Sequence, residues 1–185
     1  MKPYLIGITG GIGSGKSTVS QIISHLGYKV YNSDMRANEI INNNISVKEK
    51  LIESFGPDIY EGSTLNKEYV SKLIFNNESA KIKINSLVHP EVILDFKNWV
   101  KRNNKEKNLF KESALLFESG SYKELDKVIY IDCDKKIRVE RVIKRDPHRT
   151  KNEIEKIIKN QITSEQAIKV TDYVLVNDQK ELLLP

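Results

Sequence analysis

The sequence predicts an α/β fold in which helices cover both faces of a five-stranded parallel sheet. Five short apolar runs, rich in Val, Ile and Tyr and without a helical period, are typical of buried strands. Segments with apolar residues at helical spacing lie between them, and strands that alternate with helices form a parallel sheet. One long interval between the second and third runs adds a helical insertion to this core.

The predicted strands follow these runs in chain order. They are YLIGIT, KVYNS, LFKESALLF, KVIYIDC and DYVLVN, at residues 4–9, 29–33, 109–117, 127–133 and 172–177. The third run is the least regular, because Lys111 and Glu112 interrupt its apolar residues.

Helices are predicted at three places in the core. Segment 17–26 carries apolar residues at positions i, i+3, i+4 and i+7, and Gly27 follows it as a helix stop. The stripe consists of Val19, Ile22, Ile23 and Leu26. Segments 135–145 and 151–167 carry Ile and Val at similar spacing.

The insertion fills the long interval after the second strand. Its helix-like segments lie at residues 47–55, 68–75, 79–88 and 92–100. An insertion of this size in an α/β sheet is a candidate substrate-side or lid subdomain. The predicted division is a core of residues 1–34 and 109–185 and a helical insertion of residues 35–108.

A glycine-rich stretch between the first strand and the first helix carries the chemistry. GGIGSGKS, residues 10–17, matches G-x-x-x-x-G-K-[ST] in the strand-then-helix context that this motif requires. Glycines let successive N–H groups approach phosphate oxygens, and the helix start adds its positive dipole end. The predicted ATP-binding residues are Gly11, Ile12, Gly13, Ser14, Gly15, Lys16, Ser17 and Thr18.

Three side chains of this stretch have distinct expected roles. Lys16 supplies a full positive charge for the β- and γ-phosphates, the Ser17 hydroxyl can ligate Mg²⁺, and Thr18 can donate to an α-phosphate oxygen. The alternative is a tight turn that is simply rich in glycine, and Lys-Ser at a helix start argues against it. The sequence therefore predicts a P-loop NTPase-type core that binds ATP with Mg²⁺.

A P-loop serves switches, motors and kinases alike, so other motifs decide the class. Neither Asn-Lys-x-Asp nor Asp-x-x-Gly, which a GTPase would carry, occurs in the chain. The chain is short for a motor, and no predicted strand ends in an Asp-Glu pair. A small-molecule kinase is favoured. A nucleoside monophosphate kinase or an ATP-binding regulatory module without a kinase reaction is the alternative.

A kinase must orient or deprotonate an acceptor hydroxyl beside the γ-phosphate. Asp34 is the candidate, because it follows the second strand at the carboxyl edge of the sheet, where ligands bind in doubly wound folds. From position alone, Asp34 is equally well explained as the N-cap of a helix that begins near Met35.

Arginines are expected to cover the phosphoryl group that is transferred. Arg138, Arg141 and Arg145 share one helix face, and a turn with a proline follows them. We interpret residues 138–155 as a lid, with Arg141 and Arg145 as the phosphate-binding arginines and Arg149 as a weaker third. The alternative is a solvated helix face.

Asn177 and Asp178 follow the last strand. They are placed either to hydrogen-bond an adenine or to form a simple Asn-Asp turn, and the sequence does not separate the two.

Charge and composition limit the partners and the compartment. Lys and Arg exceed Asp and Glu by 30 to 25, and this net charge of +5 suits an anionic small molecule, weak nucleic-acid affinity or a solvated lysine-rich surface. The chain carries no aromatic-basic motif of a nucleic-acid binder, no signal peptide pattern and no membrane-length apolar stretch. Cys133 is the only cysteine. We expect a cytoplasmic monomer or weak homo-oligomer.

Taken together, the motifs resemble dephospho-coenzyme A kinases. The matching strings, in the family's order, are ITGGIGSGKST, VYNSDMRA, FG at 55–56, LNK at 65–67, LVHPEV, ALLFESG, RVIKRD, NQ at 160–161 and DYVLVND. They span nearly the whole chain. The P-loop alone is widespread, whereas its combination with SD, HP, FESG and RxxxRD is specific to this family.

The resemblance implies transfer of the ATP γ-phosphate to the ribose 3′-hydroxyl of dephospho-CoA, with Mg²⁺, in the last step of CoA synthesis. It implies a nucleotide core, a CoA-binding helical domain that matches residues 35–108, and a lid. It makes Asp34 the general base. It also places Arg141 in a lid region where an arginine contacts phosphates.

The resemblance marks two substrate-side candidates, His89 and Lys67, inside the insertion. His89 stands either at a helix boundary or at a substrate contact. Lys67 stands where the family more often has arginine, and a lysine keeps the charge but loses the two-pronged hydrogen bonding of a guanidinium. The chain ends at Pro185, earlier than the family leads us to expect, so a C-terminal helix on the sheet is expected to be absent or very short.

Overall fold

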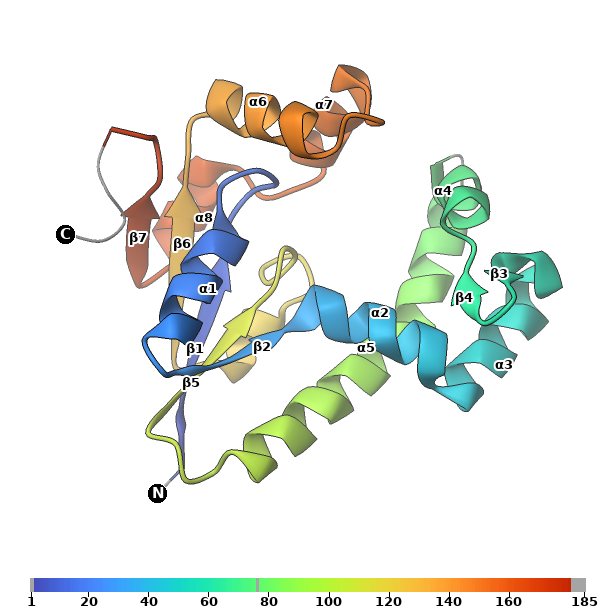
Figure 1. Ribbon diagram of the computed structural model, residues 1–185, viewed down its shortest axis with the longest axis horizontal. Coiled ribbons are helices and arrows are strands. Elements are labelled where there is room, and N and C mark those ends of the chain that lie inside the picture. The colour runs from blue at the N-terminus through green and yellow to red at the C-terminus, as the bar shows by residue number, and fades with distance from the viewer. Residues whose placement is uncertain (1, 76, 181–185) are drawn as a thin grey trace. The chain divides into compact units, whose positions relative to one another are not determined.

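The computed structural model describes residues 2–75 and 77–180. The chain divides into two compact units (Figure 1). The first unit combines the chain up to Asn32 with the chain from Asn103 onward, and the second unit runs from Ser33 to Arg102.

The first unit contains a five-stranded sheet whose strands are all parallel. The strands, in the spatial order β2-β5-β1-β6-β7, are β2 (Lys29–Asn32), β5 (Asn108–Glu112), β1 (Tyr4–Thr9), β6 (Lys127–Asp132) and β7 (Tyr173–Val176). The predicted parallel sheet is confirmed. The third predicted strand was too long, because β5 ends at Glu112. The apolar run that follows forms a turn that buries Leu116.

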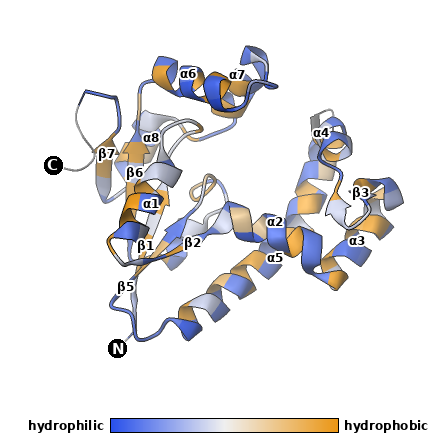
Figure 2. Cartoon of the chain, viewed as in Figure 1, coloured by the Kyte–Doolittle hydropathy of each residue, from blue (hydrophilic) through white to orange (hydrophobic). Residues whose placement is uncertain are grey.

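Helices cover both faces of this sheet. On one face, Ile8, Ile131 and Phe110 pack with Val19 of α1 (Lys16–His25). On the other face, the Tyr130 hydroxyl lies 3.1 Å from the Ser164 hydroxyl of α8 (Ser164–Val170). Figure 2 shows strands β1, β6 and β7 as predominantly apolar and the helices as mixed in polarity. This is the pattern of a sheet buried between two helical layers.

The remaining helices of the first unit are α6 (Lys135–Arg145), α7 (Lys151–Lys159) and the short 3-10 helix η2 (Ser121–Glu124). The sequence predicted one helix over 151–167, and this was wrong, because the helix is interrupted between the end of α7 at Lys159 and the start of α8 at Ser164. The Thr163 hydroxyl accepts a hydrogen bond from the Gln166 backbone N–H, and the Gln166 side-chain oxygen accepts one from the Thr163 backbone N–H. This capping box starts a new helix, and apolar spacing alone does not reveal it.

The second unit is helical. It contains α2 (Ser33–Asn43), α3 (Ile45–Phe55), η1 (Pro57–Ile59), the hairpin of β3 (Tyr60–Glu61) and β4 (Thr64–Leu65), α4 (Lys67–Phe75) and α5 (Glu78–Arg102). Its core is built on the buried residues Val47, Leu51, Ile59 and Val88. Arg36 of α2 forms a two-pronged ion pair with Asp95 of α5, at 2.8 Å on both branches.

The structure bears on the expectation for His89, whereas the expectation for the C-terminal helix lies outside the described residues. His89 and Pro90 lie inside α5, so the helix-boundary interpretation of His89 was wrong. Val88 and Phe96 are buried on either side of the proline, and α5 continues through Pro90 although proline has no backbone N–H to donate. The expectation of a missing or short C-terminal helix concerns residues 181–185, which lie outside the described residues. None of the described helices is long and apolar enough to cross a membrane.

Candidate functional site

The glycine-rich loop joins the end of β1 at Thr9 to the start of α1 at Lys16. Two of its glycines are required by geometry. Gly13 and Gly15 have φ angles of +77° and +97°, which side-chain-bearing residues rarely adopt. A Cβ atom would also collide with the Arg138 carbonyl at Gly13 and with the Asn177 amide at Gly15. The loop therefore depends on glycine for both its curvature and its close neighbours.

The Lys16 side chain folds back into the curve of this loop and is buried. Its ammonium nitrogen donates to the Gly10 carbonyl at 2.8 Å and to the Gly11 carbonyl at 3.2 Å. The neighbouring Ser14 hydroxyl is buried without a hydrogen-bond partner among the described residues. A cationic group and a spare hydroxyl in the same loop suit an anionic ligand.

Glu112 forms the centre of a polar network beside the loop. Its carboxylate accepts from the Ser17 hydroxyl at 2.8 Å and from the Asn32 side-chain amide at 2.9 Å. Glu112 is 3% exposed and stands at the carboxyl end of β5, between β2 and β1. Hydroxyl and carboxylate oxygens are the hard ligands that Mg²⁺ takes, so these residues fit that ion.

Sequence reasoning did not assign Glu112 to the site. It noted the residue only as an interruption of the third strand. The feature that could have pointed to Glu112 is a carboxylate at the end of a predicted strand in a chain that also carries a P-loop. Among the described residues, no group of three or more His, Cys, Asp or Glu side chains is placed to hold a metal by itself. In general, Mg²⁺ at phosphate sites is held by one or two protein oxygens together with phosphate and water oxygens.

Arg141 and Asn177, two of the residues predicted from the sequence, meet at the loop. The Arg141 guanidinium lies 3.4 Å from the Ser14 carbonyl and 3.4 Å from the Asn177 side-chain oxygen. The Asn177 amide donates to the same Ser14 carbonyl at 2.8 Å. Helix α6, the end of β7 and the glycine-rich loop are thereby joined.

Arg138 and Arg145, which share a face of α6 with Arg141, differ in their surroundings. Arg145 donates to both oxygens of Asp146, at 3.0 and 2.9 Å, and its side chain is 62% exposed. This hydrogen-bonded ion pair raises the pKa of Arg145 and lowers the pKa of Asp146. Arg138 lies against the loop at Gly11, and its Nε atom is buried without a partner among the described residues. The structure thus brings Arg138 and Arg141 to the loop and leaves Arg145 with Asp146.

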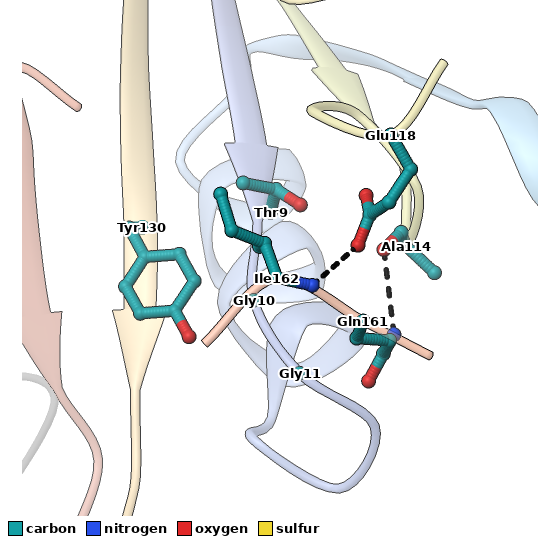
Figure 3. Close-up of a pocket in the computed structure, with 8 residues that line it drawn as sticks. All are labelled: Thr9, Gly10, Gly11, Ala114, Glu118, Tyr130, Gln161 and Ile162. Carbon is teal, nitrogen blue, oxygen red and sulfur yellow. Dashed lines mark hydrogen bonds between the residues drawn. The ribbon is translucent and has the colours of Figure 1, made fainter. Parts of the chain in front are cut away.

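A small pocket adjoins the first half of the loop (Figure 3). It is lined by Thr9, Gly10, Gly11, Ala114, Glu118, Tyr130, Gln161 and Ile162. Gln161 and Ile162 come from the break between α7 and α8, so the pocket places this break beside the loop.

Three predicted residues belong to the second unit. Asp34 is exposed and lies in the first turn of α2, two residues after β2 ends. Since Asp34 is inside the helix and not ahead of it, the N-cap alternative was wrong. Lys67 is the exposed first residue of α4. His89 lies on α5, where partial desolvation of its ring lowers its pKa.

Comparisons with known proteins identify the family. The sequence profile described as Dephospho-CoA kinase matches residues 4–182. A Fusobacterium nucleatum protein named Dephospho-CoA kinase is 37% identical over 180 residues, which is 96% of this chain and 91% of that protein.

Solved structures agree with this match. A Thermus thermophilus protein of known crystal structure is 29% identical with a TM-score of 0.86, over 97% of this chain and 91% of that one. Dephospho-CoA kinase from Campylobacter jejuni is 28% identical with a TM-score of 0.68, over 94% and 88% of the two chains. The chain belongs to the dephospho-CoA kinase family and is a kinase of coenzyme A biosynthesis.

Proposed function

We propose that the chain transfers the γ-phosphate of ATP to the ribose 3′-hydroxyl of dephospho-CoA and releases CoA and ADP. The observation that carries this proposal is the family match over residues 4–182. The residues of the glycine-rich loop, the buried Glu112 and the arginines of α6 suit the individual steps of this reaction and support the proposal.

On the donor side, the loop residues from Gly11 to Thr18 would surround the ATP phosphates, with backbone amides as hydrogen-bond donors. Lys16 would leave its bonds to the Gly10 and Gly11 carbonyls and place its charge on the β- and γ-phosphates. Arg141, beside the Ser14 carbonyl, would stabilise the negative charge on the phosphoryl group in transfer. Arg145 would join it by leaving Asp146, and Asn177 would contact the nucleotide from the end of β7.

Ser17 and Glu112 would hold Mg²⁺, which would screen the charge between the β- and γ-phosphates. Ser17 is suited as a direct ligand because its hydroxyl is at the helix start, next to Lys16. Glu112 is suited to order the ion's water ligands, because its buried carboxylate already orients Ser17.

On the acceptor side, Asp34 would take the proton of the ribose 3′-hydroxyl as general base. Residues 35–108 would bind dephospho-CoA, with Lys67 and His89 as substrate-side contacts, and residues 138–155 would act as a lid. We further propose that the enzyme is a cytoplasmic monomer or weak homo-oligomer. Cys133, its one cysteine, is buried.

A coupled assay of ADP release tests the reaction. With ATP and Mg²⁺ fixed, dephospho-CoA is expected to stimulate ADP release, and shikimate, nucleosides and nucleoside monophosphates are not. Turnover with one of those acceptors and none with dephospho-CoA would contradict the proposal. ATP binding without stimulation by any acceptor would favour a regulatory module instead.

A further inference from the structure

Gln161 links the break between α7 and α8 to the phosphate loop. Its side-chain oxygen accepts a hydrogen bond from the Ile12 backbone N–H at 2.8 Å, across 149 positions of sequence. Its side-chain nitrogen lies 3.5 Å from the Ala114 carbonyl. The next residue, Ile162, donates its backbone N–H to Glu118 at 2.9 Å. Figure 3 shows Gln161 and Ile162 facing Ala114 and Glu118 beside the loop at Gly11.

The tip of the loop meets the lid helices at two further points. The Ile12 side chain packs against the buried cluster of Val139, Val142 and Ile154, which joins α6 to α7. Gly13 approaches the Arg138 carbonyl of α6 so closely that a side chain would not fit. The loop tip is therefore held by α6, by α7 and by the break that follows α7.

The hydrogen bond from Ile12 to Gln161 determines which loop amides face a phosphate. The Ile12 N–H points to Gln161 and the Ser14 N–H points to the Gly11 carbonyl at 3.1 Å, so the phosphates are left to the other amides from Gly13 onward. Those amides converge only if the tip keeps its curve. A neutral amide suits this position, because a carboxylate acceptor would add negative charge beside the polyphosphate.

We propose that Gln161 is a positioning residue of the ATP site. Its side-chain oxygen fixes the position of the loop tip at Ile12. The loop and the lid segment thereby keep a constant position relative to each other, and the amides that follow Ile12 point at the ATP phosphates. This inference rests on the proposed function, because it takes ATP as the ligand of the loop.

The test compares Gln161→Leu with Thr163→Ala in the full chain. Leucine keeps a similar volume and removes both side-chain hydrogen bonds of Gln161. Thr163→Ala removes the cap of α8 two residues further on, and serves as the control for a general loss of stability. The measurements are the Kd for ATP by calorimetry without acceptor, the KM for dephospho-CoA, the melting temperature, and the hydrogen exchange of the Ile12 amide.

Gln161→Leu is expected to raise the Kd for ATP by about tenfold, which is the size of one lost oriented hydrogen bond. The exchange of the Ile12 amide is expected to accelerate, and the KM for dephospho-CoA to stay unchanged. Thr163→Ala is expected to lower the melting temperature at least as much as Gln161→Leu does, without changing the Kd for ATP. An unchanged Kd in Gln161→Leu, or an equal increase in both variants, would overturn the proposal. Because exchange and ATP binding are measured without turnover, failure here is distinct from failure of the kinase reaction.

Discussion

At the scale of single residues, Glu112 supplies an oxygen pair that the loop motif does not contain. Its carboxylate bonds both Ser17 and Asn32 while almost fully buried. A buried carboxylate with two donors is oriented before any ligand binds. The side chain is thus prepared to orient Ser17 and the water ligands of a cation.

Replacing Glu112 by Gln is expected to weaken the response to Mg²⁺. The amide keeps the volume but loses the charge, so the Mg²⁺ concentration for half-maximal activity should rise by about 10- to 100-fold. Activity titrated with Mg²⁺ at saturating ATP measures this change. Glu140→Gln, at an exposed site on α6, is the matched control. Identical titration curves for wild type and Glu112→Gln would exclude a role of Glu112 at the metal.

Replacing Asp34 by Asn is expected to lower kcat by about 10²-fold, the usual scale of general-base catalysis. The Kd for ATP should stay unchanged, because the loop, Lys16 and Arg141 remain intact. Rapid-quench or steady-state kinetics with dephospho-CoA measure kcat, and calorimetry measures ATP binding. If kcat stays at the wild-type level, Asp34 is only a favourable acid in the first turn of α2.

At the scale of elements, helix α6 presents its arginines to different partners. Arg141 lies against the loop carbonyls, whereas Arg145 is bound to Asp146 at an exposed site. The helix therefore brings the Arg141 guanidinium to the glycine-rich loop directly. The other must first exchange its partner.

Arg141→Ala is expected to lower kcat/KM for ATP by about 10²-fold, and Arg145→Ala by about tenfold or less. The difference arises because Arg145 gains a phosphate contact only by giving up its ion pair with Asp146. Steady-state kinetics at saturating dephospho-CoA measure both values. A larger loss in Arg145→Ala would show that the lid contact depends mainly on Arg145.

Strands β6 and β7 are tied together by Asp172. Its carboxylate accepts from the Lys127 ammonium at 2.6 Å and from the Val128 backbone at 2.9 Å. The bond to Lys127 is the main reason that the pKa of Asp172 lies below 3.8. A carboxyl whose pKa falls on folding contributes stability above its unfolded pKa and loses it as the pH falls through the folded value.

Asp172→Asn is accordingly expected to lower the melting temperature at pH 7 by about 2–4 °C. The difference from wild type should shrink as the pH falls through the lowered pKa of Asp172, where the wild-type carboxylate also becomes protonated. Thermal unfolding followed by circular dichroism at a series of pH values checks this. A difference that is the same at pH 3 and pH 7 would contradict a role of the Asp172 charge.

At the scale of the whole molecule, the two units carry different parts of the proposed reaction. The phosphate loop, Glu112, Arg141 and Asn177 all belong to the first unit. Asp34, Lys67 and His89 belong to the second. The residues proposed to bind ATP therefore belong to the first unit, and those proposed to serve the acceptor belong to the second.

Saturating Mg²⁺-ATP is expected to stabilise the wild-type protein against unfolding by about 2.7 kcal/mol at 100 times its Kd. Lys16→Ala should lose most of this stabilisation, because the variant lacks the charge that meets the β- and γ-phosphates. Differential scanning fluorimetry with and without Mg²⁺-ATP measures the shift, and adenosine is the control ligand without phosphates. Equal shifts in the two proteins would remove Lys16 from phosphate binding.

Much of the first unit could be predicted because its signals are local. A run such as Tyr4–Thr9 shows a buried strand by its composition, and the loop motif gives the position of Lys16 directly. Glu112 could not be placed, because its role depends on β5 lying between β2 and β1, and strand order is not contained in any single run. Gln161 was missed for a similar reason, since its partner Ile12 is distant in sequence.

Side chains along β5 alternate between the two faces of the sheet, so its register decides which charge meets Ser17. Glu112 pairs with Ile8 and Asn32, while Lys111, one residue earlier, faces the opposite side. A slip of one residue toward the carboxyl end of the strand would present the Lys111 ammonium where the Glu112 carboxylate now stands. A one-residue insertion ahead of Lys111 in β5 would thus reverse the charge beside Ser17 while leaving the glycine-rich motif untouched.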